Sequence, residues 1–234
     1  MSPGTVWLVG AGPGDPELMT LKAHRLLAEA DVVVHDRLVP DGVIESLPKT
    51  TRTVDVGKLP FHHKVTQDDI NRIIVEEALA GNTVVRLKGG DPFLLGRGGE
   101  EVLACRAAGV DVHVVPGVSS AIAAPAAADI PVTQRKVAPG VLVISGHEET
   151  DPSLLVTWPY TIVILMGMFR LPTIVADLIA AGKDPQTPAA IVQQAWTPAQ
   201  RHLRAPLHEL PQQASAAGLG NPAVIVIGEL AAGL

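Results

Sequence analysis

The sequence is poor in cysteine and in aromatic residues. Cys105 is the single cysteine among 234 residues, which excludes an intrachain disulfide and suits a reducing compartment. Aromatic residues make up 3% of the chain although 47% is hydrophobic, so the core must consist of Val, Leu, Ile and Ala, as in α/β sheets covered by helices. Cys105 lies in a helical pattern, where we expect a buried, inert thiol.

Long apolar runs and basic runs are also missing. No apolar stretch reaches about 18 residues, so we expect no membrane span. The N-terminus shows no secretory signal pattern, which together with the cysteine content predicts a cytoplasmic protein. The net charge is −6, which disfavours a general role in nucleic-acid binding. An acidic substrate would require arginine side chains gathered locally.

Short apolar strands alternate with helical segments along the whole chain. Strands are predicted at residues 6–9, 31–35, 52–56, 84–87, 111–115, 141–145, 161–166, 189–194 and 223–227. Helices are predicted at about 16–30, between Thr66 and Gly81, and at about 99–108, 117–128, 172–181 and 207–217. This order predicts an α/β fold, with a largely parallel sheet in the first half that is covered by helices on both faces. Pro116-Gly117 indicates a boundary between α/β domains at 1–116 and 117–234.

The most informative stretch is the glycine-rich segment that follows the strand at 84–87. It contains Gly89-Gly90-Asp91-Pro92 and then Gly96, Gly98 and Gly99. Glycine lets a ligand approach the backbone closely, and ligands of open α/β sheets bind beyond the carboxyl ends of strands. This pattern favours a ligand-binding loop over a simple turn.

Other predicted strand ends carry further candidates. Gly10 to Pro16 departs from the dinucleotide fingerprint because Asp15 occupies its last glycine position, which argues against a nicotinamide dehydrogenase. Asp15 fits a helix N-cap instead.

Asp36 and Arg37 directly follow the second predicted strand. Two interpretations of these residues remain open, a functional pair at a strand end and a simple ion pair on the surface. Lys58 follows the third strand, and the nearby histidine pair lacks further ligands, so we expect no metal.

Two later segments have equally open interpretations. Ser119 and Ser120 precede an alanine-rich helix and can either bind a ligand or cap that helix. Met166 ends a predicted strand before Gly167, where it belongs either to the core or to a cleft.

Taken together, these motifs resemble the tetrapyrrole methylase family. The resemblance covers nearly the whole chain in family order, and within the family it is greatest to the members that methylate uroporphyrinogen III. It is carried by 9–16, Asp36-Arg-Leu-Val39, Val56-Gly-Lys58, Arg86 to Phe93, Gly96 to Glu101, Val115-Pro-Gly117, Ile130 to Thr133, Met166-Gly167, Thr197 to Arg201 and Pro222 to Leu230.

The resemblance implies two α/β domains with S-adenosylmethionine in the cleft between them, and a homodimer. It implies C-methylation of uroporphyrinogen III at C2 and C7 to give precorrin-2, with Asp36 as proton acceptor and Lys58 as proton donor. The residues that it implies in cofactor contact are Pro13, Gly89, Gly90, Asp91, Leu94, Ser119, Ser120, Met166 and Ala195.

A substrate rich in carboxylates suits arginine side chains, whose planar fork matches a carboxylate. The candidates are Arg37, Arg97, Arg135 and Arg201. For each of them a solvated surface cation is the alternative. For the chain as a whole, the alternatives are another member of the family, such as a later precorrin methyltransferase, and a non-catalytic nucleoside-binding module.

Overall fold

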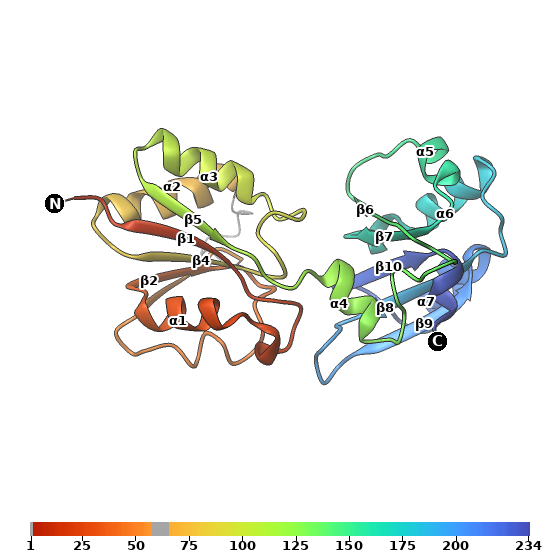
Figure 1. Cartoon of the computed structure of the whole chain (residues 1–234), viewed down its shortest axis with the longest axis horizontal. Helices are drawn as coiled ribbons and strands as arrows, with labels where there is room; N and C mark the ends of the chain where they lie inside the picture. Colours follow the sequence, from red (N-terminus) through yellow and green to blue (C-terminus); the bar gives the residue numbers. More distant parts are fainter. Residues whose placement is uncertain (1, 58–65) are drawn as a thin grey trace. The chain divides into compact units, whose positions relative to one another are not determined.

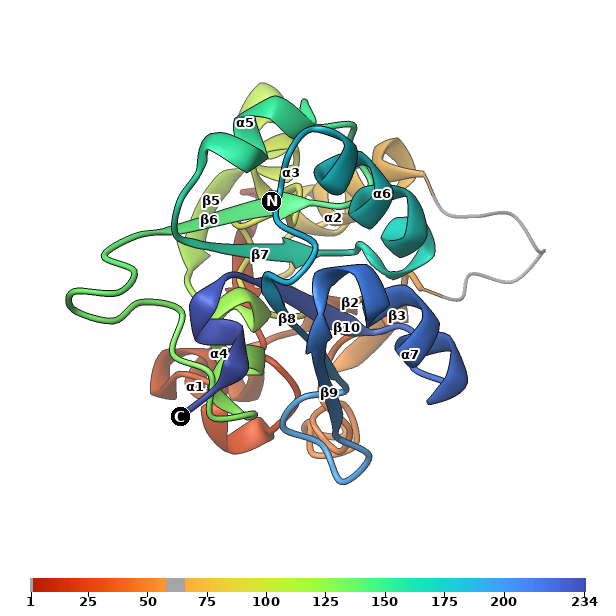
Figure 2. The same ribbon diagram turned by 90° about the vertical axis from the view of Figure 1, so that its right-hand side faces the viewer.

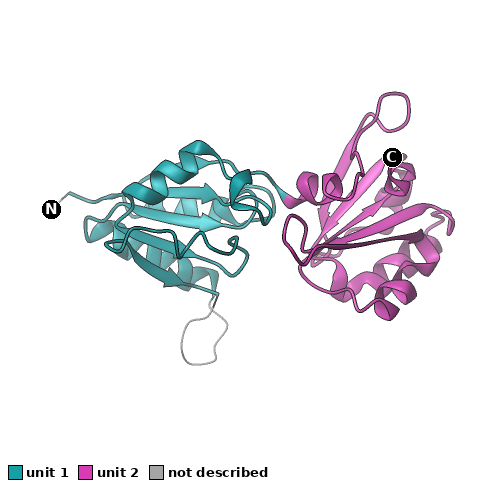
Figure 3. Cartoon of the chain, turned by 90° about the horizontal axis from the view of Figure 1, so that it is seen from below, with its two compact units in different colours: residues 1–119 teal, residues 120–234 magenta. Residues whose placement is uncertain are grey.

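The computed structural model describes residues 2–57 and 66–234. The chain forms two compact units, Met1–Ser119 and Ser120–Leu234, which we call unit 1 and unit 2 (Figure 3). The division falls close to Pro116-Gly117, and each unit contains one sheet with its own helices.

Unit 1 is built on a five-stranded sheet with the order β3-β2-β4-β1-β5. All of its neighbouring strands are parallel, which confirms the predicted parallel sheet. The strands are β1 (Thr5–Gly10), β2 (Val32–His35), β3 (Arg52–Asp55), β4 (Val84–Lys88) and β5 (Asp111–Val115).

Helices cover both faces of this sheet (Figure 1). On one face, α1 (Leu21–Glu29) packs through Leu26 and Leu27 on an aliphatic cluster. On the other, α2 (Gln67–Leu79) and α3 (Gly98–Ala107) pack on a second cluster. The side chain of Cys105 on α3 is fully buried, as expected, and burial raises its pKa to about 11.

The first helix corrects one prediction. The sequence predicted one continuous helix from about 16 to 30, but the structure divides it into the 3-10 turn η1 (Pro16–Leu18) and α1. Asp15 caps η1, as expected. The hydroxyl of Thr20 then accepts a hydrogen bond from the backbone N–H of Ala23, so a second N-cap starts a new helix.

Unit 2 contains a mixed five-stranded sheet with the order β6-β7-β10-β8-β9. The strands are β6 (Val141–Ser145), β7 (Thr161–Leu165), β8 (Pro188–Gln193), β9 (Arg201–Pro206) and β10 (Ala223–Ile227). β6 and β7 are parallel, β10 is antiparallel to both β7 and β8, and β9 is antiparallel to β8.

The sequence did not predict β9. It is an edge strand with two arginines and a histidine among its six residues, and its first two residues are exposed. Only Leu203 and Ala205 pack on the core, so the alternation of apolar and polar residues is too short to stand out.

Helices also cover both faces of the second sheet (Figure 2). On one face lie α5 (Pro152–Thr157), η2 (Met168–Arg170), α6 (Leu171–Ala180), η3 (Leu207–Glu209) and α7 (Leu210–Ala216). On the other lie α4 (Ser120–Ala126) and η4 (Glu229–Ala232). The short α5 was not predicted. Among the described residues, no helix is long and apolar enough to cross a membrane.

Candidate active site

The candidate residues of unit 1 gather at one edge of its sheet. Because all five strands are parallel, their carboxyl ends meet at the same edge. Gly10, Asp36, Gly89 and Gly117 each stand at or just beyond such an end. The fold therefore brings together residues that are far apart in the sequence.

Four glycines allow the backbone to pack tightly at this edge. Gly12 and Gly90 exchange two backbone hydrogen bonds, with N···O distances of 3.2 and 2.7 Å. A Cβ atom on Gly117 would lie 2.2 Å from the carbonyl oxygen of Gly90, and one on Gly10 would lie 2.5 Å from the nitrogen of Gly117. No side chain fits at Gly10 or Gly117, so the three strand ends pack backbone against backbone in a region that we call the glycine cradle (Gly10–Gly12, Gly89–Asp91 and Gly117).

Asp91 fastens this cradle through its carboxylate. One oxygen accepts hydrogen bonds from the backbone N–H groups of Phe93 and Leu94, at 2.8 and 3.1 Å. The other accepts from the backbone N–H of Gly117, at 3.1 Å. The carboxylate thus joins the loop after β4 to the segment after β5. In the same loop, Leu95 has a φ of 54°, a strained conformation of the kind that clusters at functional sites.

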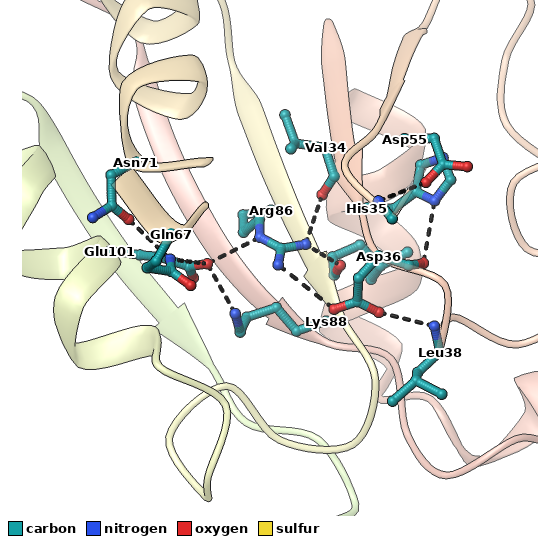
Figure 4. Close-up of polar contacts among 12 residues, drawn as sticks. Val34, His35, Asp36, Leu38, Asp55, Gln67, Asn71, Arg86, Lys88 and Glu101 are labelled. Carbon is teal, nitrogen blue, oxygen red and sulfur yellow. Dashed lines mark hydrogen bonds and ion pairs between the residues drawn. The ribbon is translucent and has the colours of Figure 1, made fainter. Parts of the chain in front are cut away.

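A buried cluster of charged side chains lies beside the cradle (Figure 4). Side chains alternate along β4, so Arg86 and Lys88 share the sheet face on which Val84 packs against α2 and α3. Glu101 of α3, which is 0% exposed, accepts hydrogen bonds through Oε1 from Arg86 Nε at 3.1 Å and Lys88 Nζ at 2.9 Å. One carboxylate therefore binds two cations on an otherwise apolar face and balances the charge of one of them.

The surroundings of Lys88 displace the pKa of its ammonium group. Burial lowers the pKa of the Lys88 ammonium, and the positive charge of Arg86 lowers it further. The charge and hydrogen bond of Glu101 act in the opposite direction. The charged form of Lys88 thus depends on its partner carboxylate.

Asp36 is connected to the cluster from its other side. It directly follows β2, and its side chain is 31% exposed. Asp36 Oδ1 accepts a hydrogen bond from the backbone N–H of Leu38 at 3.0 Å, and Oδ2 lies 3.5 Å from Arg86 Nη2. Arg86 thus stands between two carboxylates, one from β2 and one from α3.

The sequence analysis missed Arg86, Lys88 and Glu101 as interacting residues. Their signal is present in the sequence, since two cations at alternate positions of a strand that is buried on both faces require a carboxylate nearby. Which carboxylate provides it depends on the packing of α3, which the local pattern does not reveal.

Unit 2 has a comparable edge. β7 and β8 run in the same direction because both are antiparallel to β10, and β6 is parallel to β7. Their carboxyl ends therefore lie at one edge, followed by Gly146, Met166 and Gln194. Met166 and Gln194 have positive φ values of 58° and 47°, so strained backbone gathers at this edge.

Residues 5–211 match the family of Tetrapyrrole (Corrin/Porphyrin) Methylases. The chain belongs to the tetrapyrrole methylase family. A siroheme synthase of Methylococcus capsulatus is 45% identical over 233 residues, which cover 97% of this chain and 49% of the relative. The chain thus spans about half the length of that relative.

Two solved structures are similar over nearly the whole chain. A uroporphyrin-III C-methyltransferase from Thermus thermophilus, complexed with S-adenyl homocysteine, is 43% identical with a TM-score of 0.83, over 97% of this chain and 98% of that chain. A cobalt precorrin-4 methyltransferase is 25% identical with a TM-score of 0.87, over 97% and 95%. The fold is common to both, and the sequence is nearer to the first.

Most of the predicted cofactor residues lie in the segments that follow strand ends at these two edges. Pro13 lies in the loop after β1, and Leu94 lies in the loop held by Asp91. Ser119 is buried at the end of unit 1, and Ser120 begins α4. In unit 2, Met166 is 37% exposed after β7, whereas Ala195 is buried after β8. Lys58 lies outside the described residues.

The four arginines predicted to bind the substrate differ in their surroundings. Arg97 is exposed, and its guanidinium donates to both carboxylate oxygens of Glu100 at 2.8 and 2.7 Å, an interaction that raises its pKa. Arg201 pairs with Gln193 in the sheet, which places it at the edge where β8 ends, and its side chain donates to the carbonyl of Ala217. Arg37 and Arg135 are exposed, Arg37 beside Asp36 and Arg135 in the turn between Gln134 and Ala138.

No group of three or more His, Cys, Asp or Glu side chains that could hold a metal ion occurs in residues 2–57 and 66–234.

Proposed function

We propose that this methylase transfers methyl groups from S-adenosylmethionine to C2 and C7 of uroporphyrinogen III and so produces precorrin-2. The observation that carries the proposal is Asp36, a partly exposed carboxylate at the same sheet edge as the glycine cradle. The greater identity to the Thermus enzyme than to the precorrin-4 enzyme supports uroporphyrinogen III over a later precorrin. An idle nucleoside-binding module would not require a carboxylate there.

The described residues fit S-adenosylmethionine. The glycine cradle holds three strand ends in close backbone contact, and glycine lets a cofactor approach the backbone closely. The residues that we propose in contact with the cofactor are Pro13, Gly89, Gly90, Asp91, Leu94, Ser119, Ser120, Met166 and Ala195. When bound, S-adenosylmethionine supplies an electrophilic methyl group on its sulfonium. The loop that Asp91 ties down would orient it.

Asp36 is the proposed proton acceptor. Each new carbon–carbon bond displaces a proton from the macrocycle, and a positioned carboxylate that takes it contributes about 10²–10⁴-fold to the rate. Lys58, which lies outside the described residues, is proposed to return a proton. Arg37, Arg97, Arg135 and Arg201 are proposed to bind the substrate carboxylates, since a guanidinium can donate two parallel hydrogen bonds. We further propose that the methylase is a cytoplasmic homodimer, as its family resemblance and its single buried cysteine suggest.

The test of this function is an anaerobic incubation with S-adenosylmethionine and uroporphyrinogen III, followed by mass spectrometry. We expect a product that has gained two methyl groups. Methylation of a later precorrin in place of uroporphyrinogen III would identify a different member of the family. Cofactor binding without turnover of any tetrapyrrole would indicate the idle module.

The role of Asp36 is tested by Asp36→Ala. We expect kcat to fall about 10²–10⁴-fold, because the base is lost, and the affinity for S-adenosyl homocysteine to stay within about twofold in calorimetry. Asp41→Ala is the control, since Asp41 is an exposed carboxylate a few residues further along the same loop. A large loss of cofactor affinity in Asp36→Ala alone would contradict the assignment.

A further inference from the structure

Arg86 links two carboxylates that belong to different elements of unit 1. Its Nε donates to Glu101 on α3, and its Nη2 lies 3.5 Å from Oδ2 of Asp36 after β2 (Figure 4). We infer that Arg86, anchored by Glu101, is a positioning residue that holds the Asp36 carboxylate in the orientation required for proton transfer. This inference rests on the proposed function, because it assigns Arg86 a task in that reaction.

The guanidinium of Arg86 is held rigidly. It is 3% exposed, and its Nη1 donates to the carbonyl oxygen of Leu87 at 3.0 Å, in addition to the bond from Nε to Glu101. Glu101 is itself held by Lys88 and by the side-chain amide of Gln67 on α2, at 2.9 and 3.3 Å. Strand β4 and helices α2 and α3 therefore determine where Nη2 points.

Asp36, by contrast, stands on a loop. Its side chain is 31% exposed, and its bond to the N–H of Leu38 is a local one within the same turn. That bond holds Oδ1, and the contact with Arg86 holds Oδ2, so together they restrain the rotation of the carboxylate. A general base must keep its geometry closely, because a displacement of about 1 Å can cost about 10²-fold in rate.

The charges support the same arrangement. Arg86 and Lys88 carry two positive charges, and Glu101 and Asp36 carry two negative ones, so the linked groups are neutral together. Lys88 already neutralises Glu101, which leaves the charge of Arg86 available for Asp36. A lysine at position 86 would keep the charge but could not bind both carboxylates through separate nitrogens.

The test uses Arg86→Met, Arg86→Lys and the control Arg72→Met. Arg72 is an exposed arginine on α2 whose ion pairs with Asp69 and Glu76 lie on the surface. We expect Arg86→Met to lower kcat about tenfold to a hundredfold with KM for S-adenosylmethionine within about twofold, since cofactor contacts are unchanged. Arg86→Lys should recover part of kcat, and Arg72→Met should match the parent.

A double-mutant cycle with Asp36→Asn separates positioning from a general structural role. If Arg86 acts through Asp36, Arg86→Met should change kcat less than about twofold once Asp36 has been replaced. An equal loss of kcat in both backgrounds would overturn the inference, as would an unchanged kcat for Arg86→Met in the parent.

The four proteins of this cycle are the parent, Arg86→Met, Asp36→Asn and the double variant. They also test the inference if the parent does not methylate uroporphyrinogen III. In that case the proposed function fails, and the cycle is evaluated from thermal unfolding midpoints. A smaller effect of Arg86→Met on the midpoint in the Asp36→Asn background would show that Arg86 restrains Asp36. Equal midpoint shifts in both backgrounds would refute the restraint. If the parent is active and Asp36→Asn has the same kcat, the proposed function still holds, but the inference about Arg86 is overturned.

Discussion

Replacement of Glu101 by glutamine tests the buried charge cluster most directly. Glutamine has nearly the same shape as glutamate, and Glu101 Oε2 has no hydrogen-bond partner among the described residues, so the new amide nitrogen can occupy that position. Glutamine Oε1 can then still accept hydrogen bonds from Arg86 and Lys88. The substitution therefore removes a charge while it leaves the packing nearly unchanged.

The expected loss of stability follows from the geometry. The Glu101 carboxylate lies 3.1 and 2.9 Å from two cations that are 3% and 4% exposed. At an effective dielectric constant of about 20, each contact is worth about 5 kcal/mol before desolvation is counted. Removal of one partner from such a buried pair typically costs about 3–5 kcal/mol, because the other charge stays buried. We expect a loss of this size in the free energy of unfolding of unit 1.

Urea unfolding followed by tryptophan fluorescence can report on unit 1 alone. The chain has three tryptophans, and of these Trp7 alone belongs to unit 1, where its ring stacks on His113. A background with Trp158→Phe and Trp196→Phe therefore isolates the signal. Glu100→Gln is the matched control, because the neighbouring Glu100 forms an exposed pair with Arg97, and such pairs contribute little.

The stability deficit of Glu101→Gln should also depend on pH. Burial lowers the pKa of Lys88 in the folded protein, and loss of Glu101 removes the influence that opposes this shift. The folded pKa then lies below the unfolded value of about 10.4, so between the two values the unfolded chain binds more protons and stability rises with pH. The deficit should be full at about pH 7 and smaller near pH 10. A deficit no larger than that of Glu100→Gln, or one that grows with pH, would refute the reasoning.

Two further predictions concern the glycine cradle and the buried cysteine. Gly117→Ala should weaken binding of S-adenosyl homocysteine in calorimetry and cost about 1–3 kcal/mol of stability, because its Cβ would lie 2.2 Å from the carbonyl oxygen of Gly90. Gly99→Ala should leave binding unchanged, since a Cβ there meets nothing within 4 Å; equal effects of the two would contradict the close packing. Cys105 should resist iodoacetamide at pH 8 until the chain is unfolded, because burial raises its pKa to about 11. Rapid alkylation of the folded protein, measured by mass spectrometry, would show that α3 opens.

Local patterns were sufficient for much of the fold. The parallel sheet of unit 1 could be predicted because short strands alternate with helices along most of this half of the chain. The start of α2 after Thr66 was predicted correctly, and the structure shows a local reason for it, a capping box between Thr66 and Asp69, which are three residues apart. The edge strand β9 could not be predicted, because it packs few apolar side chains on the core.

The amino-acid sequence by itself determined the α/β class, the family, and the positions of Asp36 and the glycine loop at strand ends, since these depend on residues close together in the chain. Only the tertiary structure decided which strand ends meet. The order of strands in the sheet places Gly10, Gly90 and Gly117 in contact, and the packing of α3 on β4 brings Glu101 to Arg86, and Arg86 to Asp36. These contacts join residues up to 107 positions apart (Gly10 to Gly117), and a local pattern of charge and hydropathy carries no information about such distances.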